Sequence, residues 1–238
     1  MLDLHDVAPA LHRARDAVDA ALRHPALRRR GGQVTAEISL RSAVASAALE
    51  GYGYQPDDVR SGTVTDPVVQ GALRVAEALP GLEFVWPKAP RQVLARLHVL
   101  AARGVVPAAD LGRPTTGAER IDALSALVVG APDVPPMLVA AVVHGELLAL
   151  RAFPGPGGVV ARAAARLTLM AGGLDPRGLI AYEVGHLARE AEYVGAAGAF
   201  ATGTPDGLRA WIRHCAAAAE LGAAALVEVC ATPPPSSP

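Results

Sequence analysis

The residues best suited to binding a ligand lie in a glycine-rich loop between two apolar segments. The loop reads Phe153-Pro154-Gly155-Pro156-Gly157-Gly158, and Arg162 follows it by about one helical turn. Backbone N–H groups at the start of a helix lack intrahelical partners, and the helix dipole adds positive potential there. Glycines let the backbone come close to a phosphate. The spacing therefore indicates an anion-binding loop, although proline and glycine are also the ordinary residues of a plain helix–helix turn.

Two other groups of residues are weaker candidates for chemistry. Glu183, His186 and Glu190 are spaced i, i+3 and i+7, which suits a metal site but is more typical of a solvated helix face. We therefore expect no metal site there. His214 and Cys215 are adjacent, and neighbours on a helix point about 100° apart, so we do not expect a nucleophile–base pair.

Three further residues are predicted to be structural. His144 lies two helical turns before Arg151, about 10 Å along the axis, and we expect it to be a core or capping histidine. Trp86 and Trp211 are most simply core or interface residues.

The elements that must position these residues are predicted to be helices throughout. No stretch alternates as a strand would, and glycines and prolines separate segments with helical periodicity. Thr65 before Pro67 is predicted to cap one of these helices. The segment 137–150 is almost entirely apolar, so we expect it to be the most buried helix. The predicted helices span 4–22, 34–50, 65–79, 91–103, 118–129, 137–150, 159–170, 184–201 and 204–230.

Composition limits the class of protein. The chain has 238 residues, of which 51% are hydrophobic and 19% charged, so most of it is predicted to fold around a core. A net charge of −1 gives no general attraction to nucleic acid or to membrane. Two cysteines, Cys215 and Cys230, cannot form a disulfide framework. We see no signal peptide and no apolar run near the roughly 20 residues of a membrane span, and we expect a cytoplasmic protein.

The predicted organisation is a single domain with an extension at each end. Residues 1–31 are expected to form an N-terminal helical extension that ends at Gly31-Gly32. Residues 32–230 are expected to form the helical domain, and residues 231–238, rich in proline, a disordered tail.

The segment from His144 to Arg162 resembles the core motif of the Fic (Fido-fold) family. That motif is His-Pro-Phe-x-Asp/Glu-Gly-Asn-Gly-Arg-x-x-Arg, preceded by a helix that commonly bears a histidine. Phe153, Gly158 and Arg162 match motif positions, and His144 matches the upstream histidine. The resemblance covers roughly residues 32–230. It implies the helical Fic fold and a relationship to enzymes that transfer AMP from ATP to protein hydroxyls.

A second motif is similar to the inhibitory signature of the same family, Ser/Thr-x-x-x-Glu-Gly/Asn. Ser46, Glu50 and Gly51 occupy its defined positions. In that family the inhibitory glutamate pairs with the last arginine of the core motif and blocks productive placement of ATP. The resemblance therefore implies that Glu50 contacts Arg162.

The departures from the core motif imply a loss of catalysis. Arg151 stands where the family has its general base, and a guanidinium cannot accept a proton near neutral pH. Gly155 replaces the acidic ligand of magnesium, Gly157 the asparagine and Val159 the first arginine. General base catalysis alone contributes about 10²–10⁴-fold, so AMP transfer is expected to be lost. Residues 104–136 show no paired strands, so the β-hairpin flap of the family is expected to be reduced or absent.

Three functional hypotheses remain open. The first is a Fic-like pseudoenzyme with a regulatory or binding role. The second is an active transferase of altered chemistry that binds a nucleotide or phosphate ligand, clamped by Arg151 and Arg162. The third is a structural or partner-binding helical protein. No catalytic residue and no metal ligand are assigned. ATP or another nucleotide is the cofactor that the resemblance implies, and a protein partner or a homodimer is compatible with the sequence.

Overall fold

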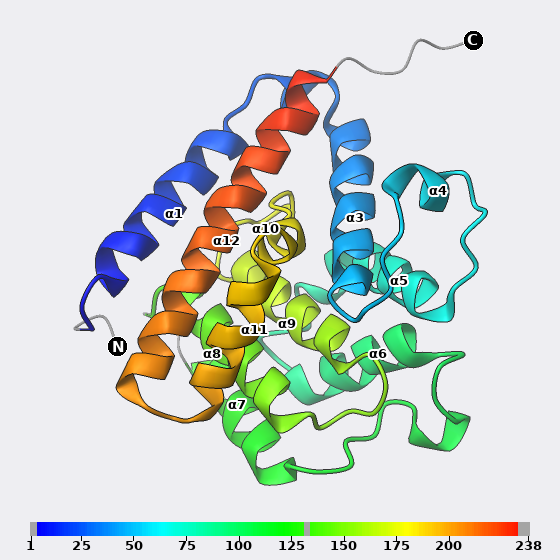
Figure 1. Cartoon of the computed structure of the whole chain (residues 1–238), viewed down its shortest axis with the longest axis vertical. Helices are drawn as coiled ribbons and strands as arrows, with labels where there is room; N and C mark the ends of the chain where they lie inside the picture. The colour runs from blue at the N-terminus through cyan, green and yellow to red at the C-terminus, as the bar shows by residue number, and fades with distance from the viewer. Residues whose placement is uncertain (1–3, 131–133, 233–238) are drawn as a thin grey trace.

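The computed structural model describes residues 4–130 and 134–232 (Figure 1). Within these ranges the chain is helical and has no strand, apart from one isolated bridge between Arg103 and Val106. This confirms the all-α class and, in the described part of 104–136, the absence of a β-hairpin flap. The elements are α1 (Val7–Leu22), α2 (Ala26–Arg29), α3 (Gly31–Ala48), α4 (Pro56–Arg60), α5 (Pro67–Leu82), α6 (Pro90–Ala102), the 3₁₀ helix η1 (Ala108–Asp110), α7 (Ala118–Gly130), α8 (Pro136–Leu150), α9 (Gly157–Ala171), α10 (Tyr182–Ala188), α11 (Glu190–Ala201) and α12 (Pro205–Ala231).

Helix α9 is the centre of the fold. It packs against α8, α6, α5 and α3, and every residue from 159 to 170 is buried. The expectation that 137–150 would be the most buried helix is therefore wrong, because α8 leaves several residues partly exposed. Arg162 and Arg166 made α9 look partly exposed in the sequence, because charged residues usually lie at the surface. Both are in fact buried and paired with carboxylates inside the protein.

The first and last helices of the described chain lie side by side in one layer. The long helix α12 lies beside α1 and also packs against α10 and α11 (Figure 1). By length and composition alone α12 could cross a membrane, but 56% of its most apolar window is buried inside the protein, as in a core helix. The proposed boundary at residue 31 remains a prediction. Of the tail 231–238, Ala231 ends α12 and Thr232 caps it, and residues 233–238 lie outside the described part.

Local side chains set the helix ends. Two sequence predictions, the cap of α5 and the continuous helix 184–201, are wrong. The α5 cap is Asp66 and not Thr65, because the Asp66 carboxylate accepts hydrogen bonds from the N–H groups of Val68 at 2.9 Å and Val69 at 3.3 Å. The predicted helix 184–201 is interrupted at Arg189, whose backbone leaves the helical region at φ −128°, ψ 40°. No glycine or proline marks this break.

Candidate functional site: the cleft at the glycine-rich loop

The glycine-rich loop begins where α8 stops at Arg151. This residue has φ 46° and ψ 40°, a left-handed conformation that closes the helix through an N–H donated to the Leu147 carbonyl. The conformation costs a non-glycine residue about 1–2 kcal/mol. Gly155 is also left-handed at φ 74°, and its carbonyl accepts the N–H of Gly157 as α9 starts. The loop is therefore a tight reversal that delivers the chain to the N-terminus of α9.

His98 on α6 holds this loop in place. The Gly112 N–H donates to His98 Nδ1 at 2.9 Å, so the ring proton is on Nε2, which donates to the Pro154 carbonyl at 2.9 Å. The buried ring of Phe153 lies against the imidazole, with ring centroids 4.9 Å apart. Burial lowers the pKa of His98, which favours the neutral ring that this pattern requires. His98 was not predicted from the sequence, although it lies on the buried stripe of α6 with Leu94 and Ala101, about one turn before and after it.

Arg162 on α9 is fully engaged beneath the loop. Its side chain is 2% exposed and donates four hydrogen bonds. Nε donates to Ser46 Oγ at 3.0 Å, and Nη2 donates to the Ser46 carbonyl at 2.8 Å and to Glu50 Oε1 at 2.7 Å. Nη1 donates to the Tyr193 hydroxyl at 3.1 Å. Burial lowers the pKa of Arg162, but Tyr193 and Glu50 outweigh burial and raise it, so the group stays charged.

The contact between Glu50 and Arg162 inferred from the two motifs is thus confirmed. Glu50 lies in the turn after α3, which Gly51 completes in the left-handed conformation at φ 91°. Only one carboxylate oxygen contacts the guanidinium, because its other nitrogens are occupied by Ser46 and Tyr193. A Cβ atom at Gly158 would lie 2.1 Å from Glu50 Oε1. Glycine at position 158 is therefore what lets the carboxylate reach the arginine.

Tyr193 connects Arg162 to His144, a link that sequence analysis did not detect. Since the tyrosine oxygen accepts from Arg162, its proton is left to donate to His144 Nε2 at 3.0 Å. His144 must then carry its own proton on Nδ1. Burial, with the charge of Arg162, lowers the pKa of His144 well below its ordinary value. His144 is thus a core histidine, as expected, and it orients the tyrosine that holds Arg162.

Two more buried histidines extend this packing, and we call His144, His186 and His214 the histidine cluster. The carboxylate of Glu192 accepts from His214 Nδ1 at 3.4 Å, so His214 Nε2 accepts from His186 Nδ1 at 3.0 Å. Trp211 is buried against all three rings. Burial lowers the pKa of His186 and of His214.

The expectation of a solvated face at 183–190 is wrong for two of its three residues. Glu183 and His186 are buried because α10 packs between α3 and α12, whereas Glu190 is exposed on α11. In the part of the chain that the structure describes, no three acidic, histidine or cysteine side chains group as metal ligands. Cys215 is also buried, and burial raises the pKa of its thiol, which suppresses the thiolate.

A cleft of about 700 Å³ opens over the loop. Its far wall is the α11 face of Tyr193, Val194 and Gly198. Arg162 lies behind Glu50 and is not exposed to this space. The sequence-predicted residues on the cleft wall are Phe153, Gly155, Gly157, Gly158, Glu50 and Arg151.

The cleft wall combines an exposed cation, a helix start and one carboxylate that is already paired. Arg151 is an exposed cation at its edge, and the start of α9 contributes positive potential. A carboxylate placed at position 155 would meet a double obstacle: the backbone is left-handed, and a Cβ there would lie 2.8 Å from Val106 Cγ1. Glu50 is the acidic side chain on the cleft wall, and Arg162 already engages it.

Comparison with known proteins gives the fold. The sequence matches no protein-family model and no curated protein. A crystal structure of a Fic family protein from Desulfovibrio desulfuricans G20 is similar with a TM-score of 0.72 and 18% identity, covering 95% of this chain and 77% of that chain. Fic-1 (residues 134–508) from C. elegans is similar with a TM-score of 0.71 and 19% identity, covering 93% of this chain and 72% of that chain. The chain therefore has the Fic fold.

Proposed function

We propose that this chain is a Fic-fold binding protein that takes an anionic ligand, a nucleotide or a related phosphate compound, in the cleft over the glycine-rich loop. In this proposal it acts as a regulatory pseudoenzyme and does not transfer AMP from ATP. The fold and the cleft support a binding role, because the loop, the start of α9 and Arg151 converge on one space of about 700 Å³.

The chemistry of the cleft wall is the observation that carries the proposal. By the motif resemblance, position 151 should supply a base and position 155 a metal carboxylate, and here they are arginine and glycine. Because Gly155 is left-handed and close to Val106, the loop as packed leaves no unstrained place for a carboxylate side chain at position 155. What remains is a binding surface without the groups that would drive transfer.

Glu50 is proposed to control access to Arg162. The carboxylate already satisfies the guanidinium at 2.7 Å, so an incoming phosphate must displace it before it can pair with Arg162. Replacing Glu50 by glycine should therefore tighten ligand binding. It should not create AMP transfer, because no base at Arg151 and no metal carboxylate at Gly155 is available to be released.

The test measures thermal stability and labelling together. Wild-type protein, Glu50→Gly and the control Glu83→Gly, whose carboxylate follows α5 and does not line the cleft, are screened with nucleotides with and without magnesium. A ligand present at about 100 times its Kd should stabilise the fold by about 2.7 kcal/mol and raise Tm by about 5–10 °C. The shift should be larger in Glu50→Gly than in either other protein.

Two results decide against the proposal. If no nucleotide shifts Tm in any variant, the chain is a helical protein whose loop is only a turn. If radiolabelled ATP labels the protein in a manner that depends on Arg151, the chain is an active transferase of altered chemistry.

A further inference from the structure

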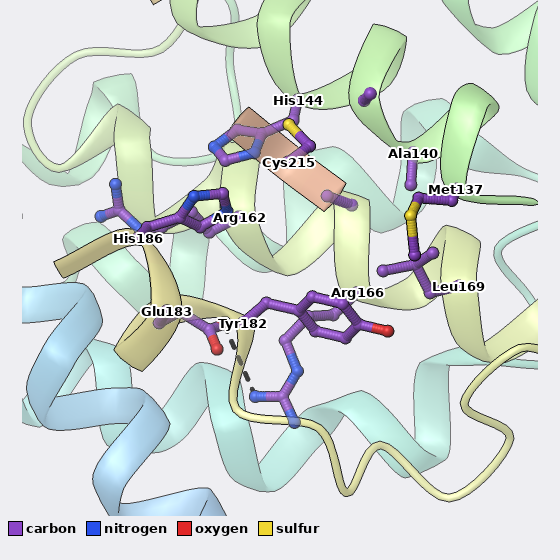
Figure 2. A pocket seen from close by; sticks show the side chains of 12 residues that line it. Met137, Ala140, His144, Arg162, Arg166, Leu169, Tyr182, Glu183, His186 and Cys215 are labelled. Carbon is purple, nitrogen blue, oxygen red and sulfur yellow. Dashed lines mark ion pairs between the residues drawn. The ribbon is translucent and has the colours of Figure 1, made fainter. Parts of the chain in front are cut away.

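A small internal cavity lies where α8, α9, α10 and α12 meet. It has a volume of about 30 Å³, and every residue that lines it is buried. Figure 2 shows His144, Arg162 and His186 on one part of its wall and Arg166, Tyr182 and Glu183 on another. Arg166 lies one turn after Arg162 on α9, so the cavity adjoins the network that holds Glu50 but is separate from the cleft over the loop.

A second and smaller cavity, of about 10 Å³, lies between α9 and the helices α3 and α5. Arg166 and Glu183 line both cavities, and Ser42 of α3 lines the smaller one. The ion pair of Arg166 and Glu183 therefore borders both cavities. Its closest approach, Nη1 to Oε1, is 3.5 Å, which is longer than a well-formed charged hydrogen bond.

The buried polar atoms without a partner in the protein coincide with these cavities. Among the described residues such atoms are Ser42 Oγ, Arg166 Nε, Tyr182 Oη and Glu183 Oε2. Tyr182 lines the larger cavity, Ser42 the smaller one, and Arg166 and Glu183 both. A buried donor or acceptor without a partner is strongly unfavourable, so a group that completes these bonds should be bound there.

We infer that the two cavities are internal hydration sites, and that water completes the hydrogen bonds of the Arg166–Glu183 pair. The chemistry of the partners selects the ligand. Arg166 Nε only donates, the Glu183 carboxylate only accepts, and the Tyr182 hydroxyl does both. Water, which both donates and accepts, satisfies all three.

An ion would fit this set less well than water. A simple anion has no proton to offer Glu183, and a metal cation would be repelled by Arg166 and by Arg162, which also lines the larger cavity. The volumes agree with water, since a site needs roughly 10–15 Å³ for one molecule. The larger cavity has room for one or two waters and the smaller for one. These waters would tie α9 to α10 on one side and to α3 on the other.

The test is a crystal structure of the full chain at a resolution that shows ordered water, repeated under xenon pressure. We expect ordered water in the cavities, so that each of Arg166 Nε, Tyr182 Oη and Glu183 Oε2 has a water peak within about 3.2 Å. We expect no xenon in the larger cavity, because xenon enters dry apolar cavities. The control Cys215→Ala changes one lining residue and leaves all three polar partners, so the water peak should persist.

A second variant reverses the expectation. Arg166→Met with Glu183→Leu and Tyr182→Phe removes the polar partners together, which avoids leaving one buried charge unpaired. In this variant the water peak should disappear and xenon should bind. If the variant does not fold, the wild-type crystals still decide. No water peak, xenon in the wild-type cavity, or a direct Arg166–Glu183 pair that closes both cavities would overturn the inference.

Discussion

Replacing Gly158 by alanine should dislodge Glu50 from Arg162, although neither charged residue is changed. The new Cβ would lie 2.1 Å from Glu50 Oε1 and 3.1 Å from Glu50 Cδ, and 2.9 Å from Arg162 Nη1. The backbone of α9 is packed on several helices and cannot retreat, so the flexible carboxylate must move. The turn that carries Glu50 leaves that side chain 19% exposed, so the displaced group can reach water.

The expected loss follows from the contact that is removed. A hydrogen bond to a charged group contributes about 1.5–3 kcal/mol, and we expect Gly158→Ala to lower the free energy of unfolding by about that amount. In a Glu50→Ala background the carboxylate is already gone. Only the clash with the end of Arg162 remains there, so the same substitution should cost less than about 1 kcal/mol.

The assay is a double-mutant cycle measured by urea unfolding. Gly157→Ala is the matched control, because a Cβ at that neighbouring position meets nothing within 4 Å. We expect it to be neutral or to stabilise α9 by up to about 1 kcal/mol. If Gly158→Ala costs the same with and without Glu50, to within about 0.5 kcal/mol, the steric account of the latch is refuted.

Three further outcomes are expected. Burial lowers the pKa values of the histidine cluster, so at acidic pH the unfolded state binds protons that the folded state excludes. The free energy of unfolding should therefore fall as the pH drops below about 6.5, by at most about 1.4 kcal/mol per pH unit for each histidine. His186→Phe should reduce that slope in unfolding curves taken from pH 8 to 5. Burial raises the pKa of Asp175 to about 6, so below that pH the folded state binds a proton more readily than the unfolded state and gains stability. This gain should make the fall in stability with pH shallower, and Asp175→Asn should remove that effect. Tyr193→Phe should lower the free energy of unfolding by about 1–2 kcal/mol, because Arg162 loses an acceptor, and an unchanged urea midpoint would contradict this. Arg151→Gly should raise the free energy of unfolding by roughly 1 kcal/mol, because glycine adopts the left-handed conformation without strain. A lower urea midpoint would show that the arginine side chain makes a stabilising contact.

Most helices could be predicted from the sequence because their signals are local. Helical periodicity, prolines at helix starts and glycines at helix ends placed α3, α5, α6, α8, α9 and α12 to within a few residues. The break at Arg189 had no such signal. Its non-helical backbone separates α10, which packs against α3, from α11, which packs against α8.

Some features of the candidate site could likewise be predicted from the sequence, and others could not. Glycine and proline spacing identified the loop, and motif resemblance paired Glu50 with Arg162, because residue types at fixed spacings along the chain carry that information. Neither revealed Tyr193, His98 or the Arg166–Glu183 pair, since these side chains act through contacts between distant segments.

What the sequence by itself determined is therefore the helical class, the glycine-rich loop, and the presence of arginine at position 151 and glycine at position 155 within the segment that resembles the Fic motif. Only the tertiary structure decided which polar residues are buried. Periodicity treats a charged residue as a sign of exposure, whereas Arg162 and Glu183 are buried because partners from other helices compensate their charges. The steric role of Gly158 has the same origin, because the atom it must accommodate belongs to a residue 108 positions earlier in the chain.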